Sequence, residues 1–320
     1  MSVFITGGSG FVGLNLLEQL LGRGEEVVSF SLSPPPERAR RVLGALPGRL
    51  RWVEGDVRDA EGVAAALAAS GARRVVHGAV ITADAARERR DAAGIVSVNI
   101  DGTVNVLEAA GDNGVERFVY LSSASVYGAN ALAADVLSEA TTAPLPETLY
   151  AVTKYAAEGI ARRYATVFGL SVIAARLSAV FGRWEYDTGL RDTLSPPYRL
   201  ARMAERGETA VLADAGERDW IYAPDVAAGI IALMDADEAR HDVYNVGTGK
   251  TWNLLEWCER LSAAWPDFSW RLASHGDAGA SVDPGRRSPL AIERILQDTD
   301  YRPSFGLDEA FDDYLAWMSR

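Results

Sequence analysis

Cysteine and histidine are scarce in this sequence. Cys258 is the single cysteine among 320 residues, and only three histidines are present, at positions 77, 241 and 275. One cysteine cannot form an intramolecular disulfide, and the Trp-rich helical stretch around Cys258 favours a buried, inert thiol. The histidines and the cysteine show none of the spacings that bind metals, so we expect no metal site.

Long apolar runs and an excess of positive charge are also missing. No stretch approaches the ~20 apolar residues that span a membrane, and the formal net charge is −12. Nucleic acids and anionic membranes both bind basic surfaces, so we expect neither as a partner. A glycine cluster that begins at residue 7 leaves no room for a signal peptide. Together these features predict a soluble, cytoplasmic protein.

That glycine cluster is the best-defined motif of the chain. A β-branched and aromatic run at residues 3–5 stops at the glycines, and a helical pattern of leucines follows at once. A strand, a tight turn and a helix in this order are typical of dinucleotide-binding folds. Gly7 allows the sharp turn, Gly10 lets the backbone approach a pyrophosphate, and Gly13 lets helix and strand pack closely. We therefore expect cofactor contacts from Gly7, Gly10, Phe11, Val12 and Gly13.

Short apolar strands alternate with helices through the first half of the chain. Strands are predicted at residues 3–5, 27–31, 50–54, 74–77, 117–121 and 171–175, with a late one at 242–246. This pattern is typical of an α/β fold of the Rossmann type, a doubly wound parallel sheet covered on both faces. Strands become sparse after residue 176, which predicts a smaller C-terminal lobe for the substrate. We expect a dinucleotide-binding domain (residues 1–177 and about 219–247) and a substrate-binding lobe (178–218 and 248–320).

Tyr150 and Lys154 stand four residues apart on a predicted helix, and so on the same face. An ammonium so close attracts a phenolate, which predicts that the pKa of the tyrosine falls below its usual value near ~10. Such a phenol is usable as a general base or acid for a hydroxyl/carbonyl pair. A chance surface pair is the alternative. Small hydroxyls at Ser123 and Ser125, just after the predicted strand 117–121, add a third element of a catalytic site.

With these features in the same order, the chain resembles the extended short-chain dehydrogenase/reductase family, which holds nucleotide-sugar epimerases and dehydratases. The resemblance covers essentially the whole length. It is carried by the glycine turn, Asp56-Val57, residues 123–128, Tyr150 with Lys154, Arg218-Asp219-Trp220-Ile221-Tyr222 and Asp225-Val226.

The resemblance implies roles for individual residues. Tyr150 would be the catalytic base, Ser123 would hydrogen-bond the reacting oxygen, and Lys154 would lower the pKa of the tyrosine and bind the nicotinamide ribose. The remaining cofactor contacts that it implies are Asp56 and Val57 at the adenine, Ala79 at the pyrophosphate and ribose, and Asn99 near the site. For Asn99 a packing role is the alternative.

The end of the second predicted strand departs from the family pattern. Members that prefer NAD carry an acid there, whereas this chain has Ser31. The missing carboxylate removes repulsion against a 2′-phosphate, and Arg38, Arg40 or Arg41 offer positive charge. We therefore expect NAD or NADP as cofactor, with NADP at least tolerated. The alternative is that Ser31 and Ser33 bind a ribose.

Two further departures concern the substrate. Ala124 and Ser125 replace the two acids that dehydratases carry, so we do not expect dehydration. Ala179 replaces an asparagine that holds the diphosphate in nucleotide-sugar enzymes, which weakens that interpretation. Arginines still suit a phosphate or a carboxylate, although structural ion pairs are the alternative. The candidate substrate-binding residues are Ser123, Ser125, Arg218 and Arg287, with Arg286 as an alternative to the last.

The sequence thus predicts an NAD(P)-dependent oxidoreductase that moves a hydride between nicotinamide and a hydroxyl or keto carbon of a carbohydrate-type substrate. It would be a sugar or sugar-acid dehydrogenase or an epimerase, with a nucleotide-sugar 4-epimerase as an alternative. A non-catalytic dinucleotide-sensing regulator is the alternative from another class. Helices predicted around residues 96–110 and 150–168 resemble the pair that builds a two-fold interface in the family, which implies a homodimer.

Overall fold

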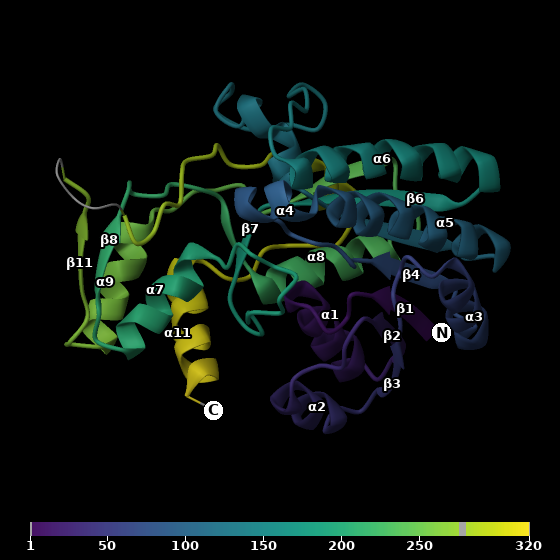
Figure 1. Cartoon of the computed structure of the whole chain (residues 1–320), viewed down its shortest axis with the longest axis horizontal. Coiled ribbons are helices and arrows are strands. Elements are labelled where there is room, and N and C mark those ends of the chain that lie inside the picture. Colours follow the sequence, from purple (N-terminus) through teal and green to yellow (C-terminus); the bar gives the residue numbers. More distant parts are fainter. Residues whose placement is uncertain (1, 275–279, 320) are drawn as a thin grey trace.

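A parallel β-sheet forms the centre of the protein (Figure 1). We describe a computed structural model, which covers residues 2–274 and 280–319. Within these residues seven strands pair in the order β10-β6-β5-β4-β1-β2-β3, all in parallel. They are β1 (Ser2–Thr6), β2 (Glu26–Ser31), β3 (Arg49–Glu54), β4 (Arg74–His77), β5 (Arg117–Ser123), β6 (Ser171–Leu177) and β10 (Val243–Val246). This order confirms the predicted doubly wound, Rossmann-type fold.

The strand order reverses between β1 and β4. β1 pairs with β2 on one side and with β4 on the other, and the chain then adds β5, β6 and β10 beyond β4. In open α/β sheets, ligands bind outside the carboxyl ends of the strands at this reversal. The loops that follow Thr6 and His77 therefore lie where a ligand is expected. The late strand joins the sheet as predicted, with Val243 opposite Ala174 of β6.

Helices cover both faces of the sheet (Figure 1). Residues of a strand alternate between the faces, so Val3 and Ile5 enter one buried cluster and Phe4 enters the other. Leucines of α1 and apolar residues of α8 complete the first cluster, whereas α3, α5 and α6 supply the second. These helices are α1 (Phe11–Gly22), α8 (Ala223–Asp235), α3 (Ala60–Ser70), α5 (Gly102–Asp112) and α6 (Leu149–Phe168).

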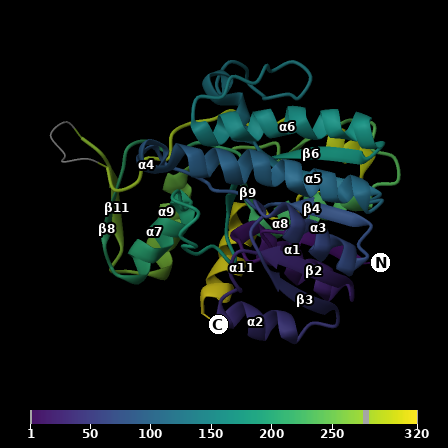
Figure 2. The ribbon, with the colours of Figure 1, turned by 45° about the vertical axis from the view of Figure 1, so that its right-hand side comes forward.

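A smaller lobe extends from one side of the sheet (Figures 1 and 2). Its elements are α7 (Pro196–Glu205), β8 (Thr209–Leu212), α9 (Leu254–Ala264), β11 (Ser269–Leu272) and α11 (Leu307–Met318). Fully buried Trp257 lies in its core with Phe181 and Phe311. The chain leaves the sheet along β7 (Ala179–Phe181) and returns along β9 (Trp220–Tyr222). These two short strands pair in parallel, and so join the lobe to the sheet.

The region predicted as the end of one long helix, residues 96–110, is interrupted. A π-helical turn, η1 (Ser97–Asp101), separates α4 (Ala85–Val96) from α5. Asn99 lies buried in this turn, where its amide accepts a hydrogen bond from the N–H of Ile81 and donates to the hydroxyl of Thr153. Single π-turns of this kind frequently occur at functional sites.

The remaining short elements are α2 (Glu37–Gly44), η2 (Ala124–Asn130) and α10 (Glu293–Asp298). None of the helices in the described residues has the length and apolar character needed to cross a bilayer.

Candidate active site

The glycine turn leaves the first turn of α1 open to a ligand. Gly7 has φ +72° and lies against the backbone of Ala79, and a Cβ on Gly13 would collide with the carbonyl oxygen of Gly7. A Cβ on Gly10 would meet only the Gly7 oxygen, at 3.2 Å, so its other side faces free space. No side chain caps α1, which begins at Phe11. Its first N–H groups are therefore available to an anion such as a diphosphate.

One cleft of about 1050 Å³ begins at this turn and runs across the carboxyl ends of the strands. Nearly all the residues that the sequence assigned to the site line it. They are Gly7, Gly10, Phe11, Val12, Gly13, Ser31, Asp56, Val57, Ala79, Ser123, Ser125, Tyr150, Lys154, Arg218 and Arg287. Asn99 does not line the cleft, because its amide is turned to Ile81 and Thr153. The structure thus favours the packing role for this residue.

Tyr150 lines the cleft from the first turn of α6. The side chain of Thr148 caps this helix by accepting a hydrogen bond from the N–H of Ala151, which fixes where the helix begins. Burial raises the pKa of the Tyr150 phenol, whereas the nearby hydroxyls of Ser123 and Thr82 lower it. Ser123 ends β5 and Thr82 follows β4, so two neighbouring strands deliver hydroxyls to the phenol.

Lys154, which was predicted to lower the pKa of this phenol, forms no hydrogen bond with it. Its Nζ donates a hydrogen bond to the carbonyl of Leu121 at 2.6 Å and lies 5.9 Å from the centre of the Tyr150 ring. Burial lowers the pKa of Lys154 to about 7. The charges that lower the pKa of the phenol are instead those of Arg191 and Arg287, and burial outweighs them.

Arg218 and Arg287 face the cleft from the lobe side. The Nε of Arg218 donates to the carbonyl of Gly285 at 3.1 Å. Neither guanidinium forms an ion pair within residues 2–274 and 280–319. Burial, together with the nearby charge of Arg218, lowers the pKa of Arg287 to about 10. Two guanidiniums that repel one another, one of them close to the Tyr150 phenol, would be stabilised by an anionic ligand.

The other end of the cleft is formed after β2 and β3. The hydroxyl of Ser31 accepts a hydrogen bond from the N–H of Ser9, so it supports the glycine turn. Asp56 accepts from Arg58, and this hydrogen bond lowers the pKa of the carboxyl.

The three arginines that were expected to attract a 2′-phosphate do not line the cleft. Arg38 lies 4.1 Å from the centre of the Trp317 ring and donates to the carbonyl of Trp317. Arg40 pairs with Glu37, and Arg41 is exposed on α2. The positive charge expected beside Ser31 therefore points elsewhere.

The histidine and cysteine side chains that the structure describes take no part in the cleft. His77 is fully buried between the hydroxyls of Thr6 and Thr103. Cys258 is buried in the lobe, where burial raises the pKa of its thiol to about 12. The described residues hold no cluster of His, Cys, Asp and Glu that suits a metal ion. His275 lies outside them.

A family model described as "NAD dependent epimerase/dehydratase family" matches residues 3–247. The chain belongs to this family. A UDP-glucose 4-epimerase of Erwinia amylovora is 29% identical over 345 residues, covering 100% of this chain and 98% of the relative. A 3-beta-hydroxysteroid dehydrogenase of Mycolicibacterium neoaurum is 37% identical over 360 residues, covering 99% and 91%. The structure of a Thermus thermophilus UDP-glucose 4-epimerase in complex with NAD is 26% identical with TM-score 0.79, covering 100% and 99%.

Membership of the NAD-dependent epimerase/dehydratase family confirms the predicted resemblance, the fold and the prediction of an NAD-dependent enzyme. The glycine turn and the uncapped start of α1 fit the diphosphate of such a cofactor.

Sequence reasoning missed Thr82, Tyr186 and Arg191, which also line the cleft. Thr82 lies three residues after Ala79 and was not part of any motif. Tyr186 and Arg191 belong to an irregular segment after β7, where no periodicity marks which side chains turn inward.

Proposed function

We propose that this protein is an NAD-dependent epimerase that inverts a hydroxyl-bearing carbon of an anionic carbohydrate. The observation that carries the proposal is the position of Tyr150. Its phenol lies in the cofactor cleft, near the hydroxyls of Ser123 and Thr82, with Arg287 close enough to lower its pKa. A proton-transfer group, a dinucleotide turn and an anion site thus share one cavity.

Proton transfer follows from this arrangement. The Tyr150 phenolate accepts the proton of the substrate hydroxyl, while the Ser123 hydroxyl donates a hydrogen bond to the same oxygen. When bound, NAD would supply the acceptor for the hydride of the reacting carbon and, once reduced, the donor that returns it. After the keto carbon has turned its other face, the Tyr150 phenol returns its proton to the oxygen. Lys154 holds the carbonyl of Leu121, and so fixes α6 against the end of β5.

We propose that the substrate carries an anionic group, because Arg218 and Arg287 both line the cleft. Guanidiniums bind phosphates and carboxylates with two parallel hydrogen bonds, so both a nucleotide diphosphate and a sugar acid suit this end of the cleft. UDP-glucose, the substrate that names the Erwinia amylovora relative, carries such a diphosphate. Ala179 also lines the cleft, but it has no polar side chain that could bind a diphosphate. A sugar acid therefore remains the alternative substrate class. We assign the substrate side of the cleft to residues 178–218 and 248–320.

A second candidate is a dehydrogenase that releases the oxidised sugar. The 37% identical relative is a dehydrogenase by name, and the same phenol and hydroxyls serve that reaction. An epimerase leaves NAD unchanged overall, whereas a dehydrogenase forms one NADH for each substrate molecule oxidised.

NAD is the proposed cofactor, with NADP tolerated. No carboxylate occupies the end of β2 to repel a 2′-phosphate, but Arg38 is packed on Trp317 and does not attract one. Saturation curves with the two oxidised cofactors test this. Equal or tighter binding of NADP would contradict the preference for NAD.

The proposal is tested with UDP-glucose, UDP-glucuronate and free sugar acids, each incubated with enzyme and NAD. Chromatography of the sugar products and absorbance at 340 nm separate the two candidates. We expect an epimeric product without net NADH, and its loss by at least ~100-fold in Tyr150→Phe, the lower end of general acid-base contributions. Stoichiometric NADH favours the dehydrogenase, and unchanged turnover in Tyr150→Phe overturns both.

We further propose a homodimer built on α6. Val152, Tyr155 and Gly159 share one exposed face of this helix at spacings of three and four residues, and nothing lies within 4 Å of a Cβ built on Gly159. Exposed apolar residues on one helix face favour a protein contact. Light scattering should give twice the monomer mass for the wild type, and the monomer mass for Val152→Arg.

A further inference from the structure

A segment of irregular structure, residues 183–195, lines the cleft between the glycine turn and the loop after β4. We call it the strap; it connects β7 to α7. The Tyr186 hydroxyl donates to the carbonyl of Ser9 at 2.6 Å, and the Arg191 guanidinium carbon lies 4.7 Å from the centre of the Phe11 ring. Ser9 and Phe11 flank Gly10. The strap thus contacts the dinucleotide turn on both sides of the glycine that faces free space.

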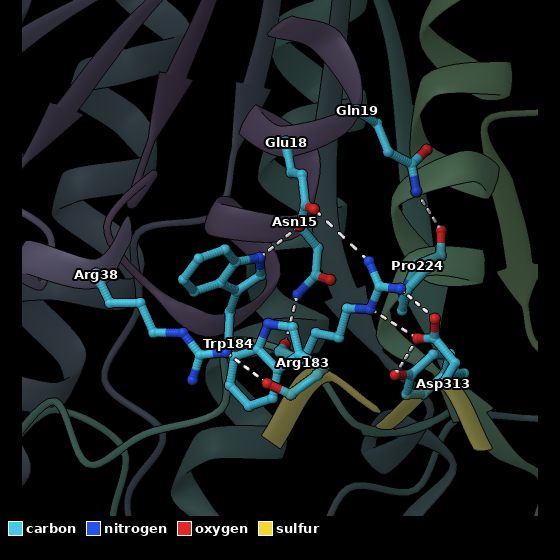
Figure 3. A network of polar contacts seen from close by, with 10 residues as sticks. Asn15, Glu18, Gln19, Arg38, Arg183, Trp184, Pro224 and Asp313 are labelled. Carbon is cyan, nitrogen blue, oxygen red and sulfur yellow. Dashed lines mark hydrogen bonds and ion pairs between the residues drawn. The ribbon is translucent and has the colours of Figure 1, made fainter. Parts of the chain in front are cut away.

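The first residues of the strap are fixed to two helices (Figure 3). Arg183 pairs with Asp313 of α11, and its carbonyl accepts a hydrogen bond from Asn15 of α1. Trp184 is buried with φ +66° and donates from its indole N–H to Glu18 at 2.6 Å. A bulky residue adopts this conformation only where its surroundings impose it. The strap is therefore held in place by contacts within the protein itself.

Arg191 is positioned by a buried acid and by backbone pairing. Glu185 accepts from both the N–H and the hydroxyl of Ser195, and its carboxylate lies 3.0 Å from the Nη2 of Arg191. On either side of Arg191, Leu190 and Asp192 exchange backbone hydrogen bonds with Thr82. Guanidinium offers five N–H donors in one plane. Arg191 can therefore keep its contact with Glu185 and still donate into the cleft that it lines.

We propose that Arg191 binds the diphosphate of the dinucleotide together with the glycine turn, so that the strap covers the cofactor. The first N–H groups of α1 and the guanidinium then face one anion from two directions. Phe11 connects the two, because it is the first residue of α1 and its ring lies beside the guanidinium.

A cofactor held in this way leaves slowly. Slow release suits an epimerase, which needs the same reduced cofactor to return the hydride to the keto sugar before that sugar escapes. This consequence rests on the proposed function, whereas the assignment of Arg191 rests only on dinucleotide binding.

Calorimetric titrations of the full chain with NAD and with ADP-ribose test the assignment without a sugar or turnover. ADP-ribose keeps the diphosphate and lacks nicotinamide. We expect Arg191→Gln to weaken both ligands by roughly tenfold or more, as for loss of a hydrogen bond to a charged group. Arg206→Gln removes the same charge from an exposed site paired with Glu208, and should change neither affinity.

Two outcomes overturn the proposal. One is unchanged affinity for both ligands. The other is weaker NAD binding with unchanged ADP-ribose binding, which places Arg191 at the nicotinamide end beside Tyr150. Arg191→Lys keeps the charge if Arg191→Gln does not fold, and should retain part of the affinity. Glu185→Gln should weaken both ligands in parallel, because it removes the group that orients Arg191. A wild-type protein that binds both ligands, with affinities that fall in Arg191→Gln, but that epimerises no sugar would count against the proposed function alone.

Discussion

Lys154 bonds to the carbonyl of Leu121, not to the phenol of Tyr150. The two side chains lie on the same face of α6, as their spacing requires, yet Nζ is 4.9 Å from the centre of the Tyr120 ring and 5.9 Å from that of Tyr150. This lysine therefore joins α6 to the end of β5. Its ammonium is almost fully buried, which makes its charge sensitive to pH.

This burial predicts a rise in stability toward alkaline pH. Because burial lowers the pKa of Lys154 to about 7 from 10.5, the folded protein binds fewer protons than the unfolded chain between those values. The free energy of unfolding then increases with pH across that window, by at most ~1.4 kcal/mol per pH unit for one group. Denaturant titrations should show that the free energy of unfolding increases more between pH 7 and pH 10 for the wild type than for Lys154→Met. Equal increases would contradict the lowered pKa.

Because His77 is buried, we expect the protein to lose stability in acid. Burial lowers the pKa of His77 to about 3 from 6.5, so only the unfolded chain takes up this proton between those values. Stability contributed by the neutral imidazole is complete above pH 6.5 and is lost as the pH falls towards 3. The midpoint temperature of thermal unfolding should therefore fall more steeply between pH 7 and pH 4 for the wild type than for His77→Gln. Parallel curves for the two proteins would rule this out.

We expect that substitution of Arg287 weakens the binding of anionic substrates. Arg287→Gln removes a guanidinium that faces the cleft, so we expect the KM for a nucleotide sugar to rise roughly tenfold or more. Its neighbour Arg286 is exposed and pairs with Glu217, which makes Arg286→Gln a matched control expected to leave the KM unchanged. Steady-state kinetics of the two variants decide the matter. Similar effects at both positions would indicate general electrostatics in place of a specific contact.

Glu158 and Arg176 form a buried ion pair, and we expect that breaking it lowers the free energy of unfolding strongly. The Arg176 Nη2 lies 2.7 Å from a Glu158 carboxylate oxygen, and the Ser122 hydroxyl donates to the same carboxylate. Removing one partner leaves a buried charge uncompensated, so Glu158→Gln should lower the free energy of unfolding by about 3–5 kcal/mol. Urea denaturation measures this. The double variant Glu158→Met/Arg176→Met should cost less than the sum of the single changes, and additive costs would argue against coupling.

Local patterns were sufficient to predict most of the fold. The glycine spacing, the alternation of strands and helices, and the pair of Tyr150 and Lys154 depend on residues close in sequence. Their geometry therefore follows from helix and strand periodicity. Even the late strand at residues 243–246 carried its own apolar signal, and it joins the sheet as expected.

Contacts between distant segments were beyond that reasoning. The direction of the Lys154 ammonium depends on where the Leu121 carbonyl lies, and the packing of Arg38 on Trp317 depends on the last helix. Arg191 reaches the cleft because Thr82 pairs with the backbone on either side of it. Each of these positions is set by tertiary structure, which local propensity does not encode.

The contact between Arg38 and Trp317 joins residues 279 positions apart and ties the last turn of α11 to α2. Helix α2 follows the proline-rich loop that borders the cleft. A purification tag fused directly after residue 320, or removal of the last few residues including the indole, would therefore disturb the wall beside the end of the cleft that is formed after β2 and β3. A tag for biochemical work is better joined through a long flexible spacer that leaves this aromatic ring in place.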